Sequence, residues 1–108
     1  MKKNIINLTP HPLVFMDEDK NILFEIPSSG IARASQKETK IGELNGLPVY
    51  KMEYGKVENL PAPKKDTIYV VSLLTAQAVP ERQDVFVVAH PVRDEKGRII
   101  GAQALAHI

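Results

Sequence analysis

The sequence predicts a single α+β domain over residues 1–108, built mostly from short antiparallel strands with one short helix packed on the sheet. Eight prolines are spread along the chain, and no apolar window is long enough for a helix of more than two or three turns, which favours short strands separated by turns. The apolar fraction of 44% and the charged fraction of 25% are typical of a globular protein. A chain of this length can bury one core without disulfides.

The first predicted hairpin joins strands at Leu13–Met16 and Ile22–Ile26 through the charged loop Asp17–Asn21. Ile22, Phe24 and Ile26 share one face of the second strand because side chains alternate along a strand. We expect that face to pack on the core.

A second hairpin is predicted around Asn45-Gly46, a dipeptide that readily adopts the positive φ angles of a tight turn. A strict two-residue register would place Lys40 opposite Lys51, and directly opposed like charges are unfavourable. The sequence therefore predicts a β-bulge near Gly42 that shifts the pairing by one residue.

Residues 66–88 are the most informative stretch, because they read as strand, short helix, strand. Thr67–Val71 is a β-branched and aromatic run typical of a buried strand. Ser72 is the expected N-cap of a helix over Leu73–Val79, which Pro80 ends. Val85–Val88 is a second buried strand, and two continuous apolar runs around a helix indicate a parallel pair.

The remaining segments are predicted to be a connector, a turn and a last strand. Val57–Lys65 contains two prolines and is expected to be extended. Asp94–Gly97 is typical of a charged turn. Ile99–Ala106 is predicted to be a strand, with a short terminal helix as the alternative because the segment is rich in alanine.

Composition narrows the function classes. A net charge of +1 disfavours a dedicated nucleic-acid binder, which usually carries a large basic face. The absence of cysteine excludes disulfides, thiolate metal sites and a cysteine nucleophile. The apolar run within Met1–Leu8 is too short for a signal or membrane segment, so we expect a cytoplasmic protein without membrane contact.

Three stretches carry a resemblance to known sequences. Near its start the chain has INLTPHPLVF, residues 6–15, followed far downstream by TIYVVSLLTAQAVPERQDV and then VRDEKGRIIG. Through these stretches it resembles a family of small uncharacterised proteins encoded in bacterial and phage genomes. The resemblance implies an accessory or mobile-element function, and it supplies no catalytic residue.

The candidate ligand-binding residues are Ser72, Arg82, Asp84, Arg93 and His11. In open α/β arrangements ligands lie beyond the carboxyl ends of strands, where the predicted helix N-terminus at Ser72 would offer free N–H groups. Guanidinium groups suit phosphate or carboxylate because their paired donors match two oxygens. The alternative is structural: Ser72 caps the helix, and Arg82 forms an ion pair with Asp84.

Metal sites are not expected. Asp17–Asn21 begins like a calcium loop, but Ile22 stands where glycine is needed and Ser28 where a bidentate glutamate is needed. The histidines at positions 11, 90 and 107 lack the short spacing of a zinc site. No cofactor motif is present.

The sequence is compatible with two functions. The first is a non-enzymatic protein of a bacterial or phage accessory system that binds a protein partner or forms a homo-oligomer through an exposed strand edge. The second is a protein or hydrolase that holds a small anionic molecule near Ser72, Arg82 and Arg93, with His11 or His90 as acid or base.

Overall fold

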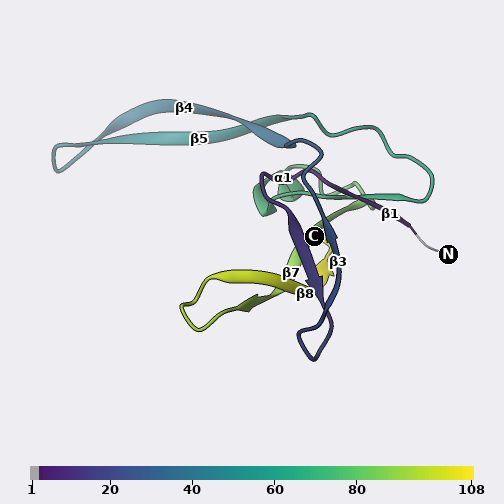
Figure 1. The fold of residues 1–108 in the computed structure, drawn as a ribbon. Coiled ribbons are helices and arrows are strands. Elements are labelled where there is room, and N and C mark those ends of the chain that lie inside the picture. Colours follow the sequence, from purple (N-terminus) through teal and green to yellow (C-terminus); the bar gives the residue numbers. More distant parts are fainter. Residues whose placement is uncertain (1–2) are drawn as a thin grey trace.

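The computed structural model describes residues 3–108 (Figure 1). Met1 and Lys2, which belong to the segment for which no signal or membrane span is expected, lie outside the described residues. The elements follow in the order β1 (Asn4–Asn7), β2 (Leu13–Met16), β3 (Ile22–Ile26), β4 (Arg33–Leu44), β5 (Leu47–Glu58), β6 (Thr67–Val70), α1 (Leu73–Ala78), β7 (Val85–Arg93) and β8 (Ile99–Ala106).

Six strands form one mixed sheet in the order β1-β6-β7-β8-β2-β3. The pairs β1·β6, β6·β7 and β2·β8 are parallel, whereas β7·β8 and β2·β3 are antiparallel. The sheet curls like a barrel, because Asn7 at the end of β1 bridges to Ser28, just beyond β3. The N–H of Ser29 donates to the carbonyl of Asn7 at 2.8 Å and holds this closure.

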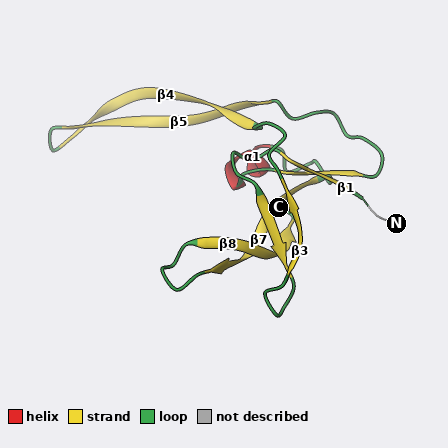
Figure 2. Ribbon diagram, viewed as in Figure 1, coloured by secondary structure: helices red, strands yellow, loops and turns green. Residues whose placement is uncertain are grey.

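The strand–helix–strand order predicted over residues 66–88 is confirmed, but the prediction that Val85–Val88 is a buried strand is wrong in part, because β7 runs on to Arg93 and Val88 is 42% exposed. β6 and β7 are parallel neighbours, with Tyr69 paired to Val85, and α1 connects them. Figure 2 shows α1 as a single short helix beside the sheet. It buries Thr75 and Ala76, and the Thr75 hydroxyl donates to the carbonyl of Ala32 at 3.1 Å.

The main core lies between β1, β6, β7 and α1. Its buried side chains come from six residues far apart in the chain: Leu8, Ala32, Tyr69, Val71, Ala76 and Val85. Together they fix the position of the segment that follows β1 and of the start of α1.

The first hairpin has the predicted bounds, but the predicted core face of β3 is wrong. Ile22 and Phe24 are 64% and 45% exposed. β3 is the last strand in the sheet order, and among the strands described over residues 3–108 it pairs with β2 alone. Phe24 contacts Phe15 with ring centroids 5.2 Å apart, while the main core lies among other strands.

The second hairpin, β4–β5, departs from the prediction in length. Each strand has 12 residues, where short strands were expected, and spans roughly 40 Å at the usual rise per residue. The hairpin projects away from the other strands as a two-stranded arm (Figure 1). The radius of gyration is 16.9 Å, whereas a compact domain of this length has about 13 Å. Residues 33–58 are called the arm below.

Local details of the arm confirm the sequence prediction. Asn45 and Gly46 have φ angles of 51° and 81°, as a type I′ turn requires. The register shifts between Lys40 and Gly42, so that Lys40 pairs with Tyr50 and not with Lys51. The bulge therefore removes the predicted clash of like charges.

The last strand is also confirmed. β8 pairs antiparallel with β7 along Val87–Arg93, which excludes the helical alternative for this segment. Gly97 has a φ of 81° in the turn between the two strands. Among the residues described, no helix has both the length and the apolar character needed to cross a membrane.

Candidate functional site

The structure contains an apolar cleft of about 1050 Å³. Its walls come from residues 9–14 before and within β2, the β6–α1 junction at residues 71–73, and parts of β7 and β8. Five polar residues lie among the lining: Thr9, His11, Glu25, Ser72 and Arg98. The cleft is assembled from segments that are distant in sequence.

A buried asparagine holds the wall formed by residues 9–12. The Asn7 side chain is fully buried, and its Nδ2 donates to the carbonyls of His11 at 2.7 Å and Ile26 at 3.1 Å. Its Oδ1 accepts the N–H and the hydroxyl of Thr9 at 2.9 and 2.6 Å. This Asx turn fixes the backbone around His11, and thus explains structurally much of the NLTPHP opening.

Ser72 stands at the N-cap position of α1, but its side chain does not cap the helix. Its backbone is extended, with φ −68° and ψ 158°, and the side chain makes no capping hydrogen bond. The hydroxyl instead lies 2.9 Å from the hydroxyl of Thr75. The predicted capping bond of Ser72 is therefore absent, because the Thr75 hydroxyl is the partner of its oxygen.

Arg82 and Asp84 form a bidentate ion pair. Arg82 Nε and Nη2 donate to Asp84 Oδ1 and Oδ2 at 2.8 Å each, and Nη2 also donates to the carbonyl of Pro61 at 2.9 Å. The guanidinium lies 6.0 Å from the ring centroid of Tyr69. The hydrogen bond from Arg82 lowers the pKa of Asp84 below its ordinary value. This pair ties the connector before β6 to the loop before β7.

The five predicted site residues therefore separate into two groups. Ser72 and His11 line the same cleft, whereas Arg82, Asp84 and Arg93 are not among its lining residues. Arg93 Nη1 donates to the carbonyl of Gly97 at 2.8 Å in the β7–β8 turn. Arg82 and Arg93 thus both make bonds that stabilise the fold.

The acidic loop and the histidines show no metal geometry. Asp17 Oδ1 accepts the N–H groups of Asp19 and Asn21 at 2.9 Å each, and the bond from the Asn21 N–H lowers the pKa of Asp17. His107 Nε2 lies 3.1 Å from the carbonyl of Arg82. Over residues 3–108, no group of three or more acidic or histidine side chains is arranged to hold a metal ion.

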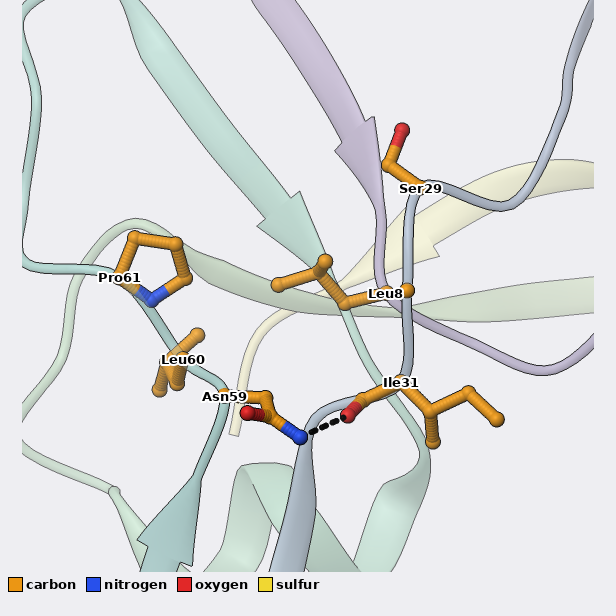
Figure 3. Close-up of a pocket in the computed structure, with 7 residues that line it drawn as sticks. Leu8, Ser29, Ile31, Asn59, Leu60 and Pro61 are labelled. Atoms are coloured by element: carbon orange, nitrogen blue, oxygen red, sulfur yellow. Dashed lines mark hydrogen bonds between the residues drawn. The ribbon is translucent and has the colours of Figure 1, made fainter.

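A second hollow of about 500 Å³ lies at the base of the arm (Figure 3). Leu8, Ile31, Leu60 and Pro61 line it, and Asn59 Nδ2 donates to the carbonyl of Ile31 at 3.3 Å. That bond joins the end of β5 to the segment before β4, so this part of the molecule anchors the arm.

The arm exposes large apolar side chains between residues 41 and 54. Tyr50, Met52 and Tyr54 alternate along β5, so they form one row on one face, and all three are exposed. At the turn, Leu44 and Leu47 are 66% and 68% exposed. We call Tyr50, Met52 and Tyr54 the apolar row.

Several functional candidates were missed by sequence reasoning. The period-two pattern of the apolar row was visible, but a hairpin with one apolar face is normally expected to pack on a core. Asn7 had a local signal in the Asn-x-Thr spacing of an Asx turn. Arg98 and Glu25 had none, because only the sheet order brings them to the cleft.

Comparisons with protein-family models, with curated proteins and with solved structures find no match to this chain.

Proposed function

We propose that this protein works by binding another protein chain through its arm, and that it is not an enzyme. The observation that carries the proposal is the arm itself, a paired hairpin of 12-residue strands with exposed apolar side chains on it. An isolated two-stranded hairpin is marginally stable in water. A partner that covers the apolar row would stabilise the arm and remove this surface from solvent.

The chemistry of the arm suits a protein partner. Tyrosine and methionine are enriched at the centres of protein interfaces, and tyrosine supplies both apolar area and a polar hydroxyl. Both long edges of the hairpin also carry unpaired backbone groups, to which another strand can add. Lysine, arginine and glutamate are nearly balanced over residues 33–58, so the arm lacks the basic excess that binding to nucleic acid needs.

The proposal also includes the kind of biological system in which the protein acts. The resemblance noted for the INLTPHPLVF opening and the two downstream segments supports a role in a bacterial or phage accessory system, in the cytoplasm.

Photo-crosslinking tests the proposal. A photo-reactive amino acid at position 52 samples the apolar row, and the same amino acid at position 18, an exposed loop residue, is the matched control. Irradiation of cells expressing each variant should give a discrete protein adduct from position 52 only. The added substitutions Tyr50→Thr and Tyr54→Thr, which keep strand propensity, should abolish the adduct. Equal adducts from both positions, or none from position 52, would overturn the proposal.

A second candidate is a small-ligand protein, and the cleft favours it. Its volume and apolar lining match ligand pockets, and Ser72 and His11 add polar groups. A hydrolase needs a base beside its nucleophile, yet the hydrogen-bond partner of the Ser72 hydroxyl is Thr75. A thermal-shift screen with nucleotides and carboxylates tests this candidate, since a ligand of the native state raises the Tm.

A further inference from the structure

We propose that the arm of one copy of this chain docks its tip into the apolar cleft of a second copy. The arm tip consists of Ile41, Leu44 and Leu47 around the Asn45-Gly46 turn. The inference rests on the proposed function, because it names the partner that the arm binds.

The arm tip and the cleft both expose apolar side chains to solvent. Ile41, Leu44 and Leu47 are all more than three-fifths exposed. In the cleft, Leu73, Val88, Ile99 and Ile100 each have more than two-fifths of their surface exposed. Monomeric soluble proteins rarely expose apolar patches of this extent without a binding role.

The sizes agree with a specific contact. A cleft of about 1050 Å³ can receive a two-residue turn flanked by two leucine side chains. Three large apolar side chains of the tip and four of the cleft are exposed. At roughly 100 Å² for each of them, one docked tip covers ~700 Å², and the two docked tips of a closed dimer cover ~1,400 Å², which is within the range of specific interfaces.

The arm cannot reach the cleft of its own chain. Its ladder is paired from Arg33·Glu58 to Leu44·Leu47, so the hairpin is extended along its length. Figure 1 shows the turn between β4 and β5 apart from β7 and β8, two strands that line the cleft. A tip held roughly 40 Å from the base of the arm must find its cleft on another molecule.

A second copy fits better than an unrelated protein, because one chain carries both halves of the contact. The charges at the two surfaces do not oppose this pairing. Lys40 and Glu43 beside the tip form an ion pair with each other at 3.3 Å, and Arg98 at the cleft donates to Asp94 at 2.9 Å. A net charge of +1 adds little repulsion between copies.

Three double variants test the inference in the full-length chain. The tip variant carries Leu44→Lys and Leu47→Lys, and the cleft variant carries Val88→Lys and Ile99→Lys. The matched control carries Ile22→Lys and Leu23→Lys, at two exposed apolar residues of β3 that lie outside both surfaces. Sedimentation velocity over a range of concentrations gives the association state of each protein and of their mixtures.

The unmodified chain and the control should associate, whereas the tip and cleft variants should each associate at least about a hundredfold more weakly. An equimolar mixture of tip and cleft variants should form a one-to-one complex, because each mixed pair retains one intact tip and one intact cleft. This recovery also shows that both variants are folded. A monomeric unmodified chain, a mixture that does not associate, or a control as impaired as the tip variant would overturn the inference. If an adduct still forms from position 52, the proposed function stands with a different partner.

Discussion

Replacing Asn7 with alanine should destabilise the protein strongly, although the change removes only a small side chain. The amide of Asn7 is fully buried and makes four hydrogen bonds, two as donor and two as acceptor. These bonds hold the chain between β1 and β2, which forms one wall of the cleft. Alanine keeps the strand but leaves the carbonyl of Ile26 and the N–H of Thr9 without this partner.

The loss in free energy of unfolding expected for Asn7→Ala depends on the number of hydrogen bonds removed and on how well water can replace them. A typical hydrogen bond contributes about 1 kcal/mol net, and a buried group left without a partner costs about 1–3 kcal/mol. His11 is exposed, so water can satisfy its carbonyl. We therefore expect a loss of about 2–4 kcal/mol, a large part of the stability of a domain of this size.

Urea denaturation followed by far-UV circular dichroism measures this loss. Asn4→Ala is the matched control, because Asn4 is exposed at the start of the same strand. Its effect should stay within about 0.5 kcal/mol. An Asn7→Ala variant that unfolds within about 1 kcal/mol of the unmodified chain would refute the reasoning, because the four bonds would then contribute almost nothing net.

Three further outcomes follow from the structure. Arg82→Met should cost about 2–3 kcal/mol in urea denaturation, because Asp84 keeps a shielded charge without its partner; an unchanged midpoint would contradict this. Since the folded state lowers the pKa of Asp84, its stabilisation is full above the ordinary aspartate pKa of about 3.9 and is lost as pH falls through the lowered value. The free-energy difference between the unmodified chain and Asp84→Asn should therefore shrink on acidification, and a difference independent of pH would refute the assignment. Gly101→Ala should lower the Tm at a cost of about 1–2 kcal/mol, because its Cβ would lie 3.0 Å from the carbonyl oxygen of Val14, which cannot move as the nearby end of Met16 can; a stabilised variant would contradict this.

Local signals were enough to predict most elements of the fold. The bounds of β2, β3 and β8, the helix after Ser72 and the bulge before Gly42 follow from side-chain alternation, turn residues and cross-strand charge. Each of these features depends on neighbours in sequence or directly across a hairpin. For that reason they do not depend on how the rest of the chain folds.

Burial and the candidate site depended on the order of strands, which no local pattern encodes. Ile22 and Phe24 follow the alternation expected of core residues. They are exposed because β3 is the last strand in the sheet order and lies apart from the main core. Ser72 and His11 meet in one cleft only because β1 lies beside β6 and the sheet curls back on itself. Arg82 was identified with its partner Asp84, but the bond to Pro61 needed the fold.

Amide hydrogen exchange measured at increasing protein concentration shows whether a second copy of the chain covers the arm. Amides of residues 41–50 should exchange quickly in dilute solution, because an isolated hairpin opens readily. They should become protected at concentrations where the chain associates, while those of β6 stay protected throughout because that strand is buried. Exchange at residues 41–50 that is the same at every concentration would contradict the claim that a second copy covers the arm.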